Sequence, residues 1–188
     1  MTRWLKRHGA IVAVADTRAA PPHAAELRRE LPDTVLECGE FRESSVRKAD
    51  LIAISPGVDR RTPTLAAAIA RGVPVAGDIE LFAQALGPLL AARAARVMPK
   101  VIAVTGTNGK STVTRMAGDI CEAAGLATVV AGNIGIPVLD TLSAIEAGAA
   151  IPAAFVLELS SYQLESTVSL NADAAAVLNV SQDHLDRY

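Results

Sequence analysis

The stretch that decides the fold is Thr105-Gly106-Thr107-Asn108-Gly109-Lys110-Ser111-Thr112, which follows the apolar run 101–104. A Gly-rich turn between a strand and a helix is where a phosphate-binding loop belongs. Its glycines let backbone N–H groups turn toward an anion, and the helix N-terminus adds partial positive charge. We predict that Lys110 reaches the terminal phosphates and that the Ser111 hydroxyl coordinates Mg²⁺.

The loop departs from the general pattern at one position. That pattern places a glycine where this chain has Val104, so the loop fits the narrower variant Gly-x-x-Gly-Lys-Ser. Two glycines flanking Lys-Ser-Thr at a helix start serve packing poorly, and we therefore expect a nucleotide ligand.

Strand and helix patterns alternate on both sides of this loop. Downstream, apolar runs predict strands at 101–104, 128–130, 154–157 and 174–178, with a helix at 110–124 and a loop at 132–137. Upstream, the same reasoning predicts strands at 11–15 (buried), 35–37, 51–54 and 73–76, and helices at 24–30, 64–71 and 79–86. This alternation predicts an α/β fold with parallel, doubly wound sheets.

We expect two domains, residues 1–92 and residues 93–188. The first is predicted to be Rossmann-like and the second a P-loop-type ATPase domain with a parallel sheet. The basic, Ala-rich segment 91–99 is either the junction between them or a solvated helix end. Residues 146–152 are predicted to form a surface loop.

The composition excludes several classes of protein. With 51% hydrophobic and 20% charged residues, the 188-residue chain is too apolar to be disordered. A formal net charge of −2 and 3% aromatic residues argue against binding nucleic acid or an anionic membrane. No apolar run reaches the length of a membrane span, and Cys38 and Cys121 match no metal spacing. We expect a cytoplasmic monomer with reduced thiols.

Four further residues are candidates for chemistry. Glu158 follows an apolar strand, where a carboxylate beside a phosphate loop can hold Mg²⁺. Asn133 lies in a Gly-flanked loop, where its amide could hydrogen-bond a substrate diphosphate or carbonyl, although asparagine is also common in plain turns. His184 follows another strand, and a lone histidine is usually structural. Asp16 ends the first strand, a position that binds a ribose hydroxyl in dinucleotide-type folds.

Several segments together resemble one family. The loop 105–112 resembles the ATP loop of the Mur ligases, which add amino acids to the peptidoglycan precursor. Within that family, the members that add D-glutamate are matched by Gly132-Asn133-Ile134-Gly135, by Leu157-Glu158-Leu159-Ser160-Ser161-Tyr162-Gln163-Leu164-Glu165, and by residues 178–188, Leu-Asn-Val-Ser-Gln-Asp-His-Leu-Asp-Arg-Tyr. Upstream, Asp16-Thr17-Arg18, Ser55-Pro56-Gly57 and Gly77-Asp78-Ile79-Glu80-Leu81-Phe82 resemble the family's uridine-nucleotide domain.

The resemblance implies an ATP- and Mg²⁺-dependent ligase that joins D-glutamate to UDP-MurNAc-L-alanine through an acyl phosphate. It implies that residues 106–112 bind ATP, that Ser111 and Glu158 hold one Mg²⁺, and that His184 holds a second and contacts the reacting phosphoryl group. It also implies that Asp16, Thr17, Arg18, Ser55, Pro56, Gly57 and Asn133 bind the UDP-sugar. From the sequence alone, residues 55–57 could equally be a plain turn.

The chain departs from the family pattern at both ends. The family's first strand and its Gly-rich loop should precede Ile11, and residues 1–9 match only the second half of the helix that follows them. The family's carbamylated lysine and its third domain would lie beyond Tyr188. We therefore expect part of a ligase that cannot ligate by itself, with exposed apolar edges on its first sheet. The alternatives are another ATP-dependent amide ligase, such as a sister Mur ligase or a folylpolyglutamate synthase, or a catalytically dead nucleotide-binding module.

Overall fold

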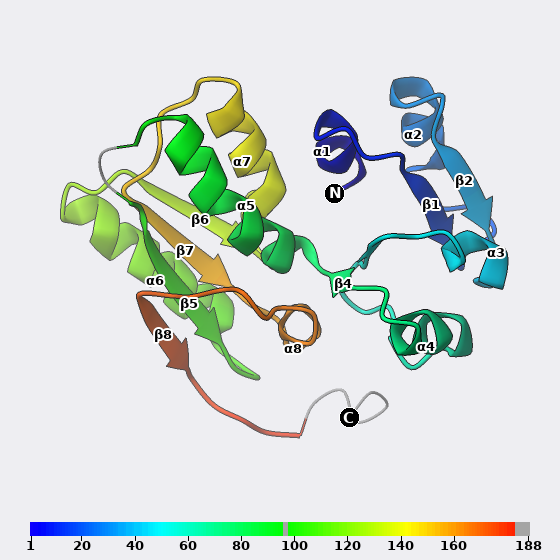
Figure 1. Cartoon of the computed structure of the whole chain (residues 1–188). Coiled ribbons are helices and arrows are strands. Elements are labelled where there is room, and N and C mark those ends of the chain that lie inside the picture. Colours follow the sequence, from blue (N-terminus) through cyan, green and yellow to red (C-terminus); the bar gives the residue numbers. More distant parts are fainter. Residues whose placement is uncertain (96–97, 183–188) are drawn as a thin grey trace. The chain divides into compact units, whose positions relative to one another are not determined.

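The computed structural model describes residues 1–95 and 98–182. It contains two compact units, the first made of Met1–Ala53 and Val58–Val75 and the second of Ile54–Gly57 and Ala76–Tyr188. Both are α/β, and every strand pair whose register is resolved is parallel, as predicted (Figure 1).

The first unit contains short strands and helices. Its helices are α1 (Thr2–Arg7), α2 (Ala24–Glu30), α3 (Glu43–Val46) and α4 (Pro63–Ala70). The strands are β1 (Ala13–Asp16), β2 (Val35–Cys38), β3 (Ile52–Ala53) and β4 (Val75–Ala76), the last of which crosses the boundary between the units. They form two sheets of two strands each, β1-β2 and β3-β4.

The first strand is less buried than predicted. β1 pairs in parallel with β2 from Ala13↔Val35 to Asp16↔Cys38, but its four residues alternate between exposed and half-buried. In the described structure it has one neighbouring strand, so the prediction of a buried strand was wrong. The predicted exposure of apolar groups is confirmed, because Ile11 and Val35 both face solvent.

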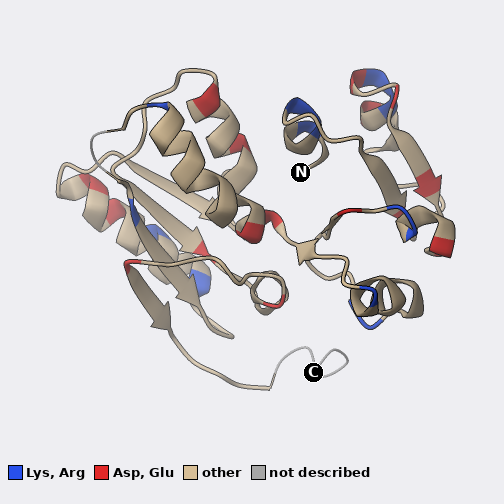
Figure 2. Ribbon diagram, in the orientation of Figure 1, with Lys and Arg blue, Asp and Glu red and all other residues tan. Residues whose placement is uncertain are grey.

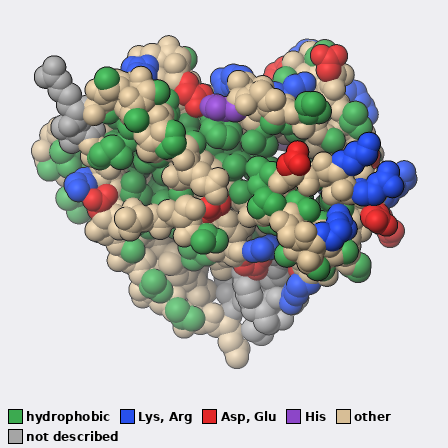
Figure 3. All heavy atoms as spheres, viewed as in Figure 1, with side chains coloured by type: hydrophobic (Ala, Val, Ile, Leu, Met, Phe, Trp, Pro, Cys, Tyr) green, Lys and Arg blue, Asp and Glu red, His purple; other side chains and the backbone are tan. Residues whose placement is uncertain are grey.

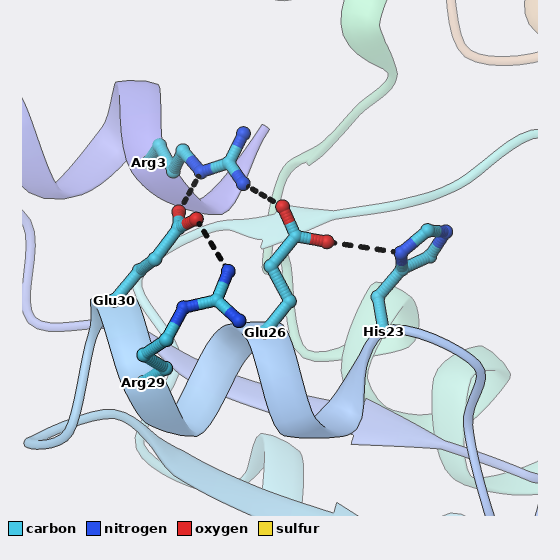
Figure 4. Close-up of polar contacts among 5 residues, drawn as sticks. All are labelled: Arg3, His23, Glu26, Arg29 and Glu30. Atoms are coloured by element: carbon cyan, nitrogen blue, oxygen red, sulfur yellow. Dashed lines mark hydrogen bonds and ion pairs between the residues drawn. The ribbon is translucent and has the colours of Figure 1, made fainter.

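Ion pairs join α1 to α2. Arg3 contacts Glu26 and donates from Nε to Glu30 at 2.6 Å, while His23 lies 3.1 Å from Glu26 (Figure 4). Basic and acidic residues also stand side by side along α2 in Figure 2. Because these side chains are more than one-third exposed, each pair contributes at most about 1 kcal/mol.

The second unit is built on a four-stranded sheet. Its strands are β5 (Lys100–Thr105), β6 (Thr128–Gly132), β7 (Ala154–Glu158) and β8 (Ala174–Val177), and its helices are α5 (Asp78–Ala92), α6 (Lys110–Ala123), α7 (Val138–Glu146) and α8 (Ser161–Leu164). The strand order is β6-β7-β5-β8, and all three pairings are parallel. In this order β5 is an interior strand with β7 and β8 as its neighbours, and the loop 105–112 follows its carboxyl end.

Helices cover both faces of this sheet. A Cβ on Gly118 of α6 would lie 2.6 Å from the Val130 side chain, whereas Phe82 of α5 packs edge-on against Phe155, with ring centroids 5.1 Å apart. Val129 is paired in register with Phe155, and side chains alternate between faces along a strand. Val130 and Phe155 therefore point to opposite faces, and α6 and α5 cover different sides of the sheet.

Helix α5 is longer than predicted. The dipeptide Gly87-Pro88 predicts a helix end, but α5 continues through it to Ala92. A proline inside a helix costs about 3 kcal/mol. That cost is offset because Phe82, Leu86 and Leu90 form one apolar stripe that is buried in the second unit, and a buried leucine contributes roughly 1.5–3 kcal/mol.

This packing also bears on segment 91–99. Arg93, which follows α5, donates to the Ile145 carbonyl at 2.7 Å, near the C-terminus of α7. Helix α5 and β5 thus belong to one compact unit, and residues 91–95 form a helix end and turn. The division at residue 92 into a sugar-nucleotide domain and an ATP domain stays a prediction.

Helices α7 and α8 were not predicted from the sequence. Val138, Leu142 and Ile145 of α7 recur at helical spacing and are buried, which is the signal that could have located it. The four exposed residues 147–150 after α7 lie in the segment predicted as a surface loop. Ser160 caps α8 through a capping box with Gln163.

Hydrogen bonds fasten the start of α5 to the segment that follows α8. Glu80, only 4% exposed, accepts from the Val168 and Ser169 N–H groups at 2.6 and 2.8 Å, and from the Ser169 hydroxyl at 2.6 Å. Asp78 accepts from the Gln163 amide at 3.1 Å. Segment 77–82, which resembles part of a uridine-nucleotide domain, therefore stabilises the second unit.

No described helix is both long and apolar enough to span a membrane. On the face shown in Figure 3, hydrophobic side chains are interspersed with charged ones. Both described cysteines, Cys38 and Cys121, are free thiols, as predicted.

Candidate functional site

The predicted loop lies between a strand and a helix, as the sequence indicates. Strand β5 ends at Thr105 and α6 begins at Lys110. Gly106 and Gly109 adopt φ values of +141° and +82°, which residues with a side chain rarely adopt. The two glycines thus allow the backbone to turn sharply and direct the N-terminus of a 14-residue helix at the loop.

The Lys110 side chain folds back over the loop. Its Nζ donates to the carbonyl oxygens of Gly106 at 2.7 Å and Thr107 at 3.0 Å. The ammonium group therefore lies against the loop backbone, where an anion held by the loop would meet it. An incoming phosphate would exchange these neutral acceptors for charged ones, which form stronger hydrogen bonds.

The N–H groups of the loop are divided between two tasks. Thr107 and Asn108 donate theirs to Asn179, which follows β8. The first N–H groups of a helix have no acceptor within the helix, so those of Lys110, Ser111 and Thr112 at the start of α6 remain for an anion. Ser111 and Thr112 are exposed, and Lys110 is half-buried.

Glu158 lies beside the loop and is almost completely buried. It is 1% exposed and is paired in register with Val104 of β5 on one side and Gly132 of β6 on the other. Because the carboxyl ends of parallel strands meet at one edge of a sheet, this carboxylate lies at the same edge as the loop. Its place in the alternation along β7 puts it on the face of Val156, which α6 covers.

Asn133 orients this carboxylate. Its Nδ2 donates to Glu158 Oε1 at 2.8 Å, and its backbone N–H donates to the Glu158 carbonyl at 2.8 Å. Gly132 makes this approach feasible, because its φ is +101° and a Cβ there would lie 2.3 Å from the Glu158 carbonyl oxygen. The structure thus brings Asn133 and Glu158 together.

The other oxygen of Glu158 fits a cation. Glu158 Oε2 is buried and has no hydrogen-bond partner in the described structure. A buried carboxylate oxygen without a partner is costly unless a ligand satisfies it. Residues 1–95 and 98–182 hold no cluster of three or more His, Cys, Asp or Glu suited to a metal. One carboxylate with the Ser111 hydroxyl suits Mg²⁺, which is commonly held by one or two protein groups together with substrate phosphates.

The residues predicted to bind a sugar nucleotide fall in different units. In the first unit, Asp16 accepts from Arg18 through the backbone N–H at 2.9 Å and through Nε at 2.8 Å. The side-chain hydrogen bonds from Arg18 lower the pKa of Asp16 to about 2. Thr17 beside them is exposed, as are Ser55, Pro56 and Gly57, which form a turn assigned to the second unit. His184, the other predicted ligand, lies outside the described residues.

Asn179 is a residue of the site to which the sequence analysis gave no role. It belongs to the segment 178–188, in which a role was predicted only for His184. Its importance depends on β8 lying next to β5, which places residue 179 against residue 108 although they are 71 positions apart.

Two families match the chain. Residues 1–77 match the Mur ligase MurD-like N-terminal domain, and residues 104–188 match the Mur ligase middle domain. Among solved structures, a UDP-N-acetylmuramate:L-alanyl-gamma-D-glutamyl-meso-diaminopimelate ligase from Neisseria meningitides is similar over 98% of this chain and 57% of that one. Its TM-score is 0.51 at 20% identity, which is a likeness of fold.

Two relatives of the chain carry the same name. A UDP-N-acetylmuramoylalanine--D-glutamate ligase of Thiobacillus denitrificans is 58% identical over 99% of this chain, and one of Methylobacillus flagellatus is 54% identical over 99%. The chain spans 40% and 38% of the lengths of these two relatives.

Proposed function

The chain belongs to the Mur ligase family, and we propose that it carries the ATP-binding loop and part of the sugar-nucleotide site of an enzyme that adds D-glutamate to UDP-MurNAc-L-alanine. The observation that carries this proposal is the 58% identity, across 99% of the chain, to a ligase named for that reaction. The geometry of the loop and the buried carboxylate beside it supports the ATP-dependent part.

Joining a carboxylate to an amine in water requires an activated acyl group. In the proposed reaction the substrate carboxylate attacks the γ-phosphate of ATP, which forms an acyl phosphate and releases ADP. The amine of D-glutamate then attacks the acyl carbon, loses a proton and displaces phosphate. The main demand on the protein is to neutralise charge on the phosphoryl group during its transfer.

The loop residues have distinct parts in this chemistry. Lys110 binds the β- and γ-phosphates after leaving the Gly106 and Thr107 carbonyls. The free N–H groups at the start of α6 bind the same phosphates, and the helix N-terminus favours their negative charge. Glu158 and Ser111 would hold Mg²⁺, which when bound neutralises charge on the phosphates. Asn133 keeps the Glu158 carboxylate in one orientation.

The binding of the sugar nucleotide by residues of both units is also part of the proposal. Asp16, Thr17 and Arg18 would bind the uracil and diphosphate side of the substrate, and Ser55, Pro56 and Gly57 would offer N–H groups to the diphosphate. The Asp16–Arg18 pair supports this assignment because it fixes the guanidinium at the carboxyl end of β1. His184 would bind a second Mg²⁺ near the transferred phosphoryl group.

A hybrid protein tests the proposed reaction. In it, this chain replaces the matching segment of the Thiobacillus denitrificans ligase, and phosphate release is measured with ATP, Mg²⁺ and UDP-MurNAc-L-alanine. We expect D-glutamate to stimulate phosphate release, whereas L-lysine, meso-diaminopimelate and L-glutamate do not. A hybrid that folds but responds to another amino acid, or to none, would contradict the proposal.

The charge of Glu158 should determine the effect of Mg²⁺. Glu158→Gln keeps the shape of the side chain and an oxygen for Asn133, but it removes the negative charge. In the hybrid, ATP affinity is measured by titration with Mg²⁺ and with EDTA, and the ratio of the two affinities gives the effect of Mg²⁺. We expect this ratio to be at least tenfold smaller in the variant than in the parent. Glu122→Gln, on the exposed side of α6, is the matched control. An unchanged Mg²⁺ effect in Glu158→Gln would show that another group holds the ion.

A further inference from the structure

Asn179 makes an unusual set of contacts with the phosphate loop. Its side-chain Oδ1 accepts from the Asn108 N–H at 2.8 Å, and its Nδ2 donates to the Asn108 carbonyl at 2.9 Å. Its own carbonyl accepts from the Thr107 N–H at 3.0 Å. One residue thus satisfies three backbone groups of two consecutive loop residues.

Neighbouring residues reinforce this arrangement. The Ser181 N–H donates to the Thr107 hydroxyl at 3.0 Å, and a Cβ on Gly106 would lie 3.1 Å from the backbone N and O of Asn179. The segment after β8 therefore lies close against the first half of the loop. This contact follows from the register, in which Val177 pairs with Thr105 at the ends of β8 and β5.

An amide is the side chain that suits this position. The N–H and carbonyl of Asn108 need an acceptor and a donor side by side, and the planar amide of asparagine or glutamine carries both on adjacent atoms. A carboxylate would place a second acceptor against the Asn108 carbonyl, and an aliphatic side chain would satisfy neither group. A longer glutamine would displace the loop.

These bonds fix which N–H groups face an anion. The Thr107 and Asn108 N–H groups point at Asn179 and are not available to an anion. After the bend at Gly109, the N–H groups at the start of α6 are the ones left to bind it. Without the side chain of Asn179, the peptide around Asn108 could rotate and the loop would sample several shapes. Ordering it again on binding would cost conformational entropy, which lowers affinity.

We propose that Asn179 is a positioning residue that holds the loop in its phosphate-binding shape, an inference that rests on the function proposed above. It acts through Asn108 and does not touch the nucleotide. The inference makes the segment after β8 a part of the nucleotide site. Nucleotide affinity would therefore depend on a residue that lies 71 positions after Asn108.

Two measurements on the 188-residue chain test this inference. Hydrogen exchange of peptides covering residues 105–112 reports on the loop without any ligand, and titration with inorganic tripolyphosphate and with MgATP reports on binding. The variant is Asn179→Ala, and the matched control is Asn171→Ala, an exposed asparagine before β8. Asn179→Asp keeps the acceptor for the Asn108 N–H and removes the donor, so its loop exchange should lie between those of the parent and the alanine variant.

For Asn179→Ala we expect faster exchange in 105–112, a melting temperature without ligand that falls only slightly, and about tenfold weaker binding of both tripolyphosphate and MgATP. If the affinities for the two ligands fall by the same factor, the variant affects the contacts with the phosphates, which both ligands share. Exchange equal to that of the parent would overturn the proposal, and so would faster exchange with unchanged affinity. A large fall in the melting temperature without ligand would also overturn it, because a destabilised fold would then account for the lost affinity. If the parent chain binds neither ligand, the proposed function fails in this chain, and the exchange data alone decide whether Asn179 fixes the loop.

Discussion

Replacing Lys110 by alanine should abolish the stabilisation of this chain by ATP. A ligand that binds only the native state raises its melting temperature, and this increase shrinks as affinity falls. Lys110 supplies the positive side chain of the loop, and the loss of a hydrogen bond between charged groups costs roughly 1.5–3 kcal/mol, or about a tenfold to hundredfold loss of affinity. We therefore expect a rise in melting temperature with MgATP for the parent chain and none, at the same concentration, for Lys110→Ala.

The measurement must compare melting temperatures with and without ligand for each variant. Lys110 also donates to two loop carbonyls in the unliganded structure, so Lys110→Ala loses those bonds and its melting temperature without ligand should fall slightly. Lys100→Ala is the matched control, because Lys100 begins β5 at the opposite end from the loop and pairs with Asp173 at the surface. An ATP-induced rise in Lys110→Ala as large as that in Lys100→Ala would place the nucleotide elsewhere.

The sequence was most informative where the residues of a site are contiguous. Glycines, lysine and hydroxyl groups in residues 105–112 predict a phosphate loop by their spacing, and the structure has the predicted strand, turn and helix there. Glu158 could also be placed, because an apolar run that ends in a carboxylate marks the end of a buried strand. Both predictions rest on local patterns, which tertiary contacts do not alter.

The sequence was least informative where function or length depends on distant partners. The residues next to Pro88 do not indicate that α5 continues to Ala92. The helix continues because Leu90 is buried in the second unit, which is a tertiary contact. The roles of Asn179 and Glu80 likewise depend on partners that only the strand order and the packing of α5 bring near. Periodicity could have located α7, since Val138, Leu142 and Ile145 have helical spacing.

The buried carboxylate of Glu80 should make the second unit sensitive to acid. Burial by itself raises its pKa, but hydrogen bonds from the Ser169 hydroxyl and N–H, the Val168 N–H and the Gln84 amide outweigh burial and lower the pKa to about 2. A carboxylate whose pKa is lower in the folded than in the unfolded chain stabilises the fold above its ordinary pKa, near 4.5. This stabilisation is lost as the pH falls from about 4.5 toward 2, and it amounts to roughly 3 kcal/mol.

Glu80→Gln should remove this contribution at neutral pH as well. The amide oxygen could still accept from the Val168 and Ser169 N–H groups, but it carries no charge, and the NH₂ group would replace the oxygen that accepts from the Ser169 hydroxyl and the Gln84 amide. Losing hydrogen bonds to a charged group costs roughly 1.5–3 kcal/mol. Urea unfolding of the parent, Glu80→Gln and the surface control Glu122→Gln between pH 7 and pH 3 measures both effects. We expect Glu80→Gln to be least stable at pH 7 and to lose less stability on acidification than the other two. Parallel pH profiles for all three proteins would mean that the contacts of Glu80 with residues 168 and 169 do not stabilise the folded chain. The start of α5 would then be held by its apolar packing and by the hydrogen bond between Gln163 and Asp78.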